Sequence, residues 1–205
     1  MASSNEIRDP RADHLLTPQN AALLIIDFQP VQVHSLASDI DKRLLVANIT
    51  AVARTARLYG LPIVLSTVNV SSGRNEPTIH QLREVLGDGV EAIDRTSINA
   101  WEDADFVAAV EATGRRKLII AALWTEVCLV FPALDALAAG YEVYPVVDAV
   151  GGTSEVAHRA GLERLVQAGA RPTTWVQLAC ELQRDWNRQA TVPDFADIVF
   201  AVEGN

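Results

Sequence analysis

Three residues of types that serve in nucleophilic catalysis stand at the ends of hydrophobic runs, namely Asp27, Arg95 and Cys128. Cys128 follows the run 118–124 and falls in the first turn of a predicted helix. The partial positive charge of a helix N-terminus favours a thiolate, and the unpaired N–H groups of that turn can hold an oxyanion. Position alone favours the alternative that Cys128 is a small buried hydrophobe.

The other two residues also follow strand-like runs. Asp27 closes the run 21–28, and Arg95 follows the short run 89–94. In a doubly wound sheet the first and fourth strands commonly neighbour each other at the crevice beyond their carboxyl ends. An acid and a guanidinium can therefore converge on the thiol. Taken singly, Asp27 could be a capping aspartate and Arg95 a surface or salt-bridge arginine.

Strands and helices alternate along the chain. Residues 117–152 form a β-α-β unit, in which Thr125 is a favoured N-cap type and Gly140 ends the helix. Strands are predicted at 21–28, 61–70, 89–94, 118–124, 141–147 and 172–178, and helices at 42–59, 77–86, 103–113, 127–139, 155–168 and 179–187. This alternation predicts an α/β doubly wound three-layer sandwich around a six-stranded parallel, Rossmann-like sheet.

Length and composition set the remaining expectations. The 205 residues suit one domain, with 1–20 as an N-terminal arm and 188–205 as a C-terminal tail. The net charge of −9 argues against a nucleic-acid partner. Two distant cysteines make no disulfide framework, and neither a signal peptide nor a membrane-length apolar run is present, so we expect a cytoplasmic protein.

Cofactor and metal motifs are missing from the sequence. The segment 87–92 matches a loose GxGxxA pattern, but it follows a helix and precedes a strand, which is the reverse of the dinucleotide-binding context. The four histidines show no ligand-like pairing. We therefore expect no cofactor and no metal.

Several short motifs occur in order along the chain: LLIIDFQ (23–29), INAW (98–101), LIIAALWTEVC (118–128), GYEV (140–143), VVDA (146–149) and ACEL-x-RDW (179–186). Together they resemble the isochorismatase-like cysteine hydrolases, and within them the YcaC-like hydrolases, from residue 21 to 186. The resemblance implies that Asp27, Arg95 and Cys128 form a catalytic triad. Arginine stands where most of the family has lysine, and it can orient groups and stabilise anions but cannot shuttle a proton.

The resemblance also implies a cis peptide bond four residues before the cysteine, between Leu123 and Trp124. Such a bond would aim the N–H groups of Trp124 and Cys128 at one oxyanion. The sequence itself adds that Pro132 cannot donate to the carbonyl of Cys128, so the nucleophile's turn is not a regular helix.

The resulting hypothesis is a hydrolase that cleaves a C–N, amide-like bond of a small molecule, with Cys128 as nucleophile and Asp27 as general base. Gln29, Asn99, Trp101 and Trp124 are the expected substrate pocket. Gln29 and Asn99 could equally fix loop backbone, and Trp124 could be ordinary core. The alternative function is a non-catalytic or ligand-binding oligomeric member of the same fold.

Three further expectations follow. The stretch 67–70 lacks the metal ligands of nicotinamidases, which argues against that activity. A homo-oligomer is expected, and the YcaC-like branch suggests a ring-based octamer. An activated Cys128 should be alkylated quickly at mildly acidic pH, whereas Cys180, expected inside the apolar face of a helix, should react slowly.

Overall fold

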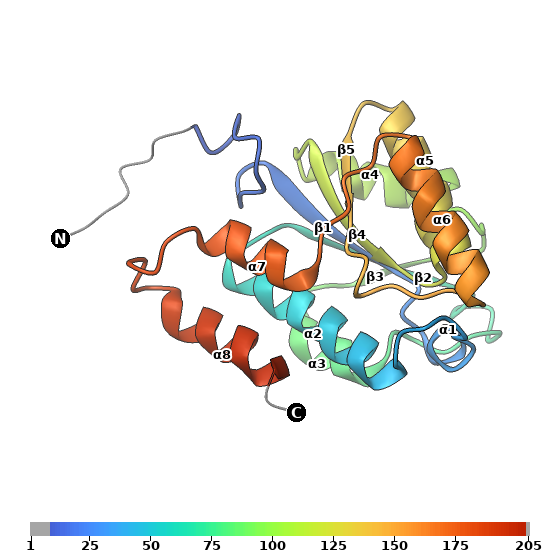
Figure 1. The fold of residues 1–205 in the computed structure, drawn as a ribbon. Coiled ribbons are helices and arrows are strands. Elements are labelled where there is room, and N and C mark those ends of the chain that lie inside the picture. Colours follow the sequence, from blue (N-terminus) through green and yellow to red (C-terminus); the bar gives the residue numbers. More distant parts are fainter. Residues whose placement is uncertain (1–8, 204–205) are drawn as a thin grey trace.

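The structure, a computed structural model, describes residues 9–203 and has a single parallel sheet at its centre (Figure 1). Its strands are β1 (Ala21–Ile26), β2 (Ile63–Val68), β3 (Ala92–Arg95), β4 (Lys117–Ala122) and β5 (Glu142–Pro145). Their order is β3-β2-β1-β4-β5, and every neighbouring pair is parallel. The winding direction reverses between β1 and β4, which is where an open α/β sheet offers its crevice.

Helices cover both faces of the sheet (Figure 1). One layer contains α2 (Lys42–Leu58), α3 (His80–Leu86), α7 (Trp175–Gln183) and α8 (Val192–Glu203). The other contains α4 (Ala104–Ala112), α5 (Val130–Ala138) and α6 (Glu155–Gln167). Three short helical segments complete the fold: α1 (Pro30–His34), the 3-10 turn η1 (Ala100–Glu102) and the π-helical turn η2 (Thr125–Leu129).

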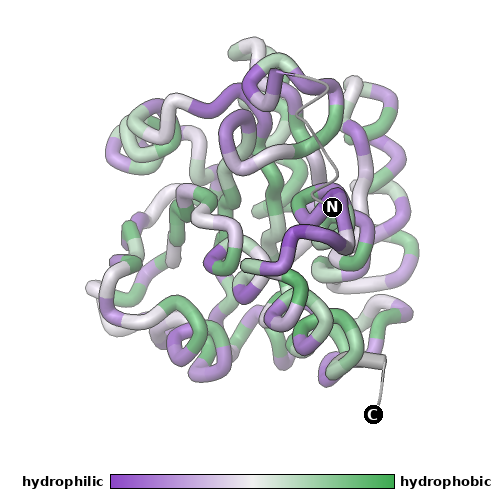
Figure 2. The backbone as a smooth tube through the Cα atoms, turned by 90° about the vertical axis from the view of Figure 1, so that its left-hand side faces the viewer, coloured by the Kyte–Doolittle hydropathy of each residue, from purple (hydrophilic) through white to green (hydrophobic). Residues whose placement is uncertain are grey.

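The sheet and its helices bury a continuous hydrophobic core. All residues of β1 and β4 are buried, as expected for central strands covered on both faces. Figure 2 shows the hydrophobic strands in the interior, surrounded by helices in which hydrophobic and hydrophilic positions alternate. Within residues 9–203 no helix is both long and apolar enough to cross a membrane.

The predicted sixth strand, 172–178, is wrong, and the sheet has five strands. Thr173 forms only an isolated parallel bridge with Val146. The next residue, Thr174, leaves the sheet because its side chain accepts a hydrogen bond from the N–H of Gln177 and caps α7. The N-capping threonine therefore prevails over the β-propensity of this segment.

The segments predicted as loop and tail are partly helical. The stretch after β1 begins α1, with Pro30 at the first helical position, where proline is favoured. The tail contains α8, which packs against α2 and α7 and buries Phe195, Ile198 and Val199. Residues 204–205 lie outside the described part of the chain.

The N-terminal arm is anchored on the domain from residue 9 onward, and residues 1–8 lie outside the described part. Leu16 is fully buried. The ammonium of Lys117, at the start of β4, donates to the carbonyls of Asp13, His14 and Leu15 at 2.7, 2.9 and 3.0 Å. The arm is therefore fixed to the surface of the domain, with Leu16 in the core.

Strand register brings the carboxyl ends of the strands level with one another. Ile26 of β1 pairs with Ser66 of β2 and with Ala122 of β4, and Val68 pairs with Arg95 of β3. The residues that follow these strands therefore gather at one edge of the sheet.

Candidate active site

Asp27 and Arg95 form a buried ion pair at the carboxyl edge of the sheet. The two guanidinium nitrogens Nη1 and Nη2 donate to Oδ1 and Oδ2 of Asp27 at 2.8 and 2.7 Å, and both side chains have no exposed surface. The guanidinium also donates to Ser66 Oγ at 2.9 Å and to the carbonyls of Thr67 and Ile98 at 3.1 and 3.2 Å. A bidentate pair with these additional partners holds the carboxylate in one orientation.

The backbone at Asp27 turns sharply as it leaves β1. Asp27 has a φ of 60°, in the left-handed region that aspartate adopts more readily than most residues. Its N–H still donates to the carbonyl of Ser66 at 3.0 Å, while its own carbonyl accepts from Gln29 N at 2.8 Å. The carboxylate is thus placed at the carboxyl edge of the sheet by the end of the strand ladder itself.

Cys128 lies against this carboxylate and is 7% exposed. Burial raises the pKa of its thiol, and the charge of Asp27 and a hydrogen bond with that carboxylate raise it further. Arg95 and a hydrogen bond from the N–H of Trp124 act in the opposite direction but do not outweigh them. In the resting protein the thiol is therefore protonated, which differs from the thiolate expected at a helix N-terminus.

The turn that carries Cys128 is η2, a single π-helical turn. The carbonyl of Trp124 accepts from Val127 N at 3.1 Å and from Leu129 N at 3.2 Å, the second being an i→i−5 bond. Neither bond uses the N–H of Cys128. The irregular turn predicted from Pro132 is confirmed. The peptide bond between Leu123 and Trp124 is cis, the geometry that the family resemblance implies.

Contacts from α6 and the loop before it hold this turn in place. Thr125, predicted as the N-cap, makes no capping hydrogen bond: its hydroxyl lies 2.8 Å from His158 Nδ1, and its N–H donates to the carbonyl of Gly151 at 2.9 Å. Oε1 of Glu126 accepts from Thr153 N at 2.9 Å and from Thr153 Oγ1 at 2.6 Å. Burial lowers the pKa of His158, which suits a neutral ring whose Nδ1 accepts from the threonine hydroxyl.

Two glycines allow α6 and the loop before it to approach η2 closely. A Cβ on Gly161 would stand 3.2 Å from Glu126 Cα and 3.3 Å from Thr125 Cγ2, and one on Gly152 would stand 2.7 Å from Glu126 Oε2. A glycine within a predicted helix commonly marks a close approach, so Gly161 was a signal in the sequence.

Among the predicted pocket residues, the two amides bind the protein's own backbone and side chains. Gln29 is fully buried, its Nε2 donates to the carbonyls of Val68 and Glu76, and its Oε1 accepts from Val68 N. Asn99 accepts from Trp101 N at 3.1 Å to cap η1 and donates to Asp135 at 2.7 Å. These contacts favour the alternative that both amides fix loop backbone rather than bind substrate.

The two predicted pocket tryptophans are partly buried. Trp101 makes edge-to-face contacts with Phe106 and Tyr141, at centroid distances of 6.4 and 5.7 Å. Trp124 donates through Nε1 to the carbonyl of Gln32 at 3.2 Å and to Ser35 Oγ at 3.1 Å, which ties the turn that carries Cys128 to α1. Both indoles keep some exposed surface. The partner Tyr141 of Trp101 precedes β5, at the amino end of that strand, whereas Trp124 follows the carboxyl end of β4.

The second cysteine and the metal expectation complete the account of this site. Cys180 is exposed on α7, so its prediction as part of an apolar helix face is wrong. Within residues 9–203, no three histidine, cysteine or acidic side chains are grouped in a way that could hold a metal ion.

Comparison with known proteins identifies the family. The model of the isochorismatase domain matches residues 21–177. The chain is 40% identical over 171 residues to a probable hydrolase, YcaC of Escherichia coli, covering 83% of this chain and 81% of that one.

Two solved structures agree with this assignment. YcaC from Pseudomonas aeruginosa, solved with hexane-2,5-diol and covalent acrylamide, has a TM-score of 0.80 at 34% identity and covers 93% of this chain and 98% of its own. The E. coli YcaC structure, described as an octameric hydrolase of unknown specificity, has a TM-score of 0.79 at 36% identity over 93% and 97% of the two chains. The chain therefore belongs to the isochorismatase family of hydrolases.

Proposed function

We propose that this hydrolase cleaves the C–N bond of a small amide-like substrate with Cys128 as the nucleophile and Asp27 as the general base. One observation carries the proposal: the thiol of Cys128 is buried beside the carboxylate of Asp27, which Arg95 holds with two hydrogen bonds. In space, the base lies between the nucleophile and the orienting group, which is the arrangement that covalent catalysis requires.

The reaction begins with a protonated thiol, which the raised pKa of Cys128 favours. As the sulfur attacks the substrate carbonyl, its proton passes to Asp27, and the carbonyl oxygen becomes an oxyanion held by the N–H groups of Trp124 and Cys128. When the C–N bond breaks, Asp27 returns the proton to the leaving amine. Water then attacks the thioester, gives a proton to Asp27, and releases the acid while the cysteine recovers its proton.

Arg95 acts as an orienting and charge-balancing group in this scheme. Burial alone would lower the pKa of Arg95, but its hydrogen bonds and charge interaction with Asp27 raise it, so it stays protonated. It therefore keeps the carboxylate directed at the sulfur without exchanging protons itself.

The relatives are consistent with this proposal. The P. aeruginosa YcaC structure contains covalent acrylamide, an electrophile that carries an amide group. The E. coli YcaC is octameric, and we extend this to a proposal that the present chain is a homo-oligomer, in which a neighbouring copy can complete the walls around the 7% of Cys128 that is exposed.

The test is hydrolysis of a panel of small primary amides, followed as ammonia release, together with the adduct mass after incubation with acrylamide. We compare the wild type with Cys128→Ala and with Cys180→Ala, a matched thiol removal on the exposed face of α7. Hydrolysis and one adduct should be lost only with Cys128. Equal hydrolysis by wild type and Cys128→Ala would refute the nucleophile, and no hydrolysis of any amide by the wild type would favour a non-catalytic, ligand-binding protein.

A further inference from the structure

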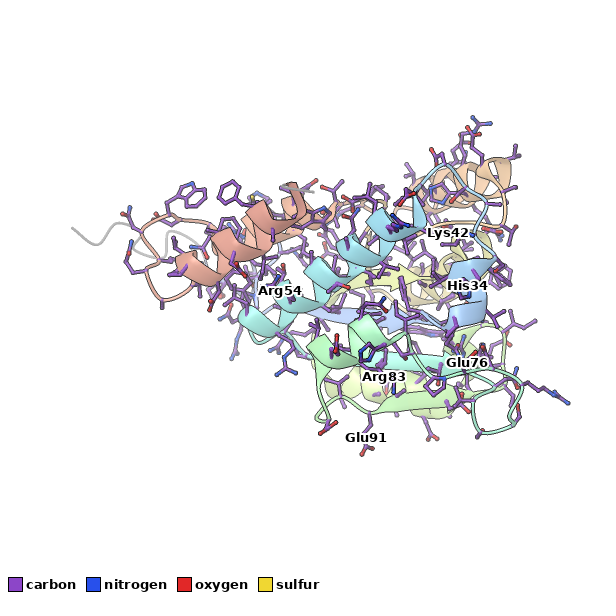
Figure 3. All side chains as sticks on the ribbon, turned by 90° about the horizontal axis from the view of Figure 1, so that it is seen from below. His34, Lys42, Arg54, Glu76, Arg83 and Glu91 are labelled. Atoms are coloured by element: carbon purple, nitrogen blue, oxygen red, sulfur yellow. The ribbon has the colours of Figure 1, made fainter. Side chains whose placement is uncertain are left out.

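A second hollow, of about 440 Å³, lies on the face of the sheet that α3 covers. Its walls come from β2, β3, α3 and the segment 70–78, and they are mostly apolar, with Leu65, Leu86 and Ala92 among them. The volume falls within the roughly 300–1,000 Å³ typical of small-molecule sites. Figure 3 shows this side of the molecule, with Arg83 on α3 and Glu91 just before β3.

The hollow and the catalytic ion pair lie on opposite faces of the sheet. Consecutive residues of a strand point to opposite faces. Ser66 binds Arg95, whereas the hydroxyl of Thr67 donates to Asp94 Oδ1 at 3.0 Å and lines the hollow. A ligand in the hollow would therefore occupy a site separate from Cys128.

Two polar groups in the hollow have unused binding capacity. Thr78 is only 3% exposed, and its hydroxyl has no hydrogen-bond partner within the described residues. Asp94 accepts hydrogen bonds from Thr67, Val70 N and Ser71 N, all of them neutral donors. Asp94 forms no ion pair among residues 9–203.

The carboxyl group of Asp94 is ionised at neutral pH. Burial tends to raise its pKa, but hydrogen bonds from Ser71, Val70 and Thr67 bring it down to about 2. The other ionisable groups of the hollow are the exposed side chains of Arg83 and Asp88, whose charges offset each other. The hollow therefore carries a net negative charge at Asp94, surrounded by apolar walls.

We propose that this hollow binds a small primary amine in its ammonium form. An ammonium group has three donors and no acceptor, so one donor can bind Asp94. A second can bind the Thr78 hydroxyl, whose oxygen is covered in the free protein, once the side chains around it shift. A short alkyl chain would lie against Leu65, Leu86 and Ala92. A carboxylate of the same length would be repelled by Asp94, and an alcohol would leave that charge unpaired.

The experiment is an NMR titration of the full-length wild type with n-butylammonium at neutral pH, with butyrate and 1-butanol as length-matched ligands. We expect saturable binding of the ammonium and weaker or absent binding of the other two. Asp94→Asn should weaken the ammonium by about tenfold or more, because the charge-assisted hydrogen bond is lost. Glu91→Gln removes one negative charge nearby, from a residue outside the hollow, and should leave the affinity unchanged.

Thr78→Val provides a second variant that does not depend on Asp94. Its hydroxyl has no partner to lose, so this variant should fold, and its affinity for butylammonium should fall severalfold. The proposal is overturned if the wild type shows no saturable binding, if butyrate binds as well as butylammonium, or if both variants bind like the wild type. The catalytic proposal is tested separately, since Cys128→Ala should bind the amine normally.

Discussion

The sharpest prediction concerns Asp27→Asn, which should lower the pKa of the Cys128 thiol while abolishing catalysis. In the native structure Asp27 raises that pKa by its charge and by a hydrogen bond, and its effect exceeds the opposing effect of Arg95. Asparagine has almost the same shape but no charge. The guanidinium would remain and would then favour the thiolate.

The magnitude follows from the charges. Two unit charges about 4 Å apart at an effective dielectric constant near 20 interact by roughly 4 kcal/mol. Since one pKa unit corresponds to about 1.4 kcal/mol, removing the carboxylate charge should lower the thiol pKa by roughly three units. A variant that has lost the proposed general base would thus have the more easily ionised cysteine.

The assay is a pH titration of thiolate ultraviolet absorbance. Cys180 is exposed and also titrates. A parallel titration of Cys128→Ala records the absorbance of Cys180 alone, which is subtracted from each curve. The lone buried guanidinium should destabilise Asp27→Asn by about 3–5 kcal/mol, so circular dichroism must show that the variant is folded. The double variant Asp27→Asn/Arg95→Gln avoids that lone charge and should shift the titration in the same direction, by less.

A titration midpoint that stays unchanged or rises in both variants would refute the electrostatic account of this site. The same account replaces the expectation of rapid alkylation of Cys128 at mildly acidic pH, because a thiol beside an ionised carboxylate does not become a thiolate there.

Three other predictions test parts of the structure outside the triad. Gly161→Ala should lower the free energy of unfolding by about 1–3 kcal/mol and slow acrylamide adduct formation, because its Cβ would crowd η2. Gly89→Ala is the control, since a Cβ there meets open space and should change neither quantity. Equal rates of adduct formation in the two variants would contradict this prediction. Lys117→Met removes three hydrogen bonds to the N-terminal arm. It should lower Tm by at least about 6 °C in calorimetry and expose the arm to proteolysis. An unchanged Tm would count against the anchoring of the arm by Lys117. The pKa of Asp94 is lowered from 3.8 to about 2, so the stability it contributes is complete above pH 3.8 and lost as pH falls through 2. Denaturant titrations of Asp94→Asn should show weaker pH dependence than the wild type in that interval, and identical curves would contradict the assignment.

Much of this architecture was predictable from local patterns. The continuous hydrophobic runs of β1 and β4 identify central buried strands, and glycines and capping residues mark most helix ends. Because parallel strands end at one edge, the positions of Asp27, Arg95 and Cys128 near the ends of three different strands indicated that they could converge, and the family resemblance implied that they form a triad. Their meeting depends on register, which the structure supplies.

Most of the predictions that were wrong depend on tertiary contacts, which the sequence patterns do not contain. Residues 172–178 combine β-propensity with a good N-cap, and only tertiary contacts decide between a strand and α7. In α8 the spacing of Val192, Phe195, Ile198 and Val199 is helical, so that helix could have been recognised. The ionisation state of Cys128 could not have been predicted from the sequence, since it depends on how close Asp27 lies in space. The hydrogen bonds of Gln29 and Asn99 likewise involve partners far away in the sequence.

The alternation of Ser66 and Thr67 along β2 has a consequence for how this protein tolerates change. One hydroxyl serves the triad's arginine and the next serves the hollow behind it, so deleting or inserting a single residue in β2 would turn both hydroxyls away from their partners at once. Two chemically unrelated sites would then fail together, although neither shares a side chain with the other. Length changes should be accepted only beyond Ser71, because the N–H groups of Val70 and Ser71 still bind Asp94 in the hollow.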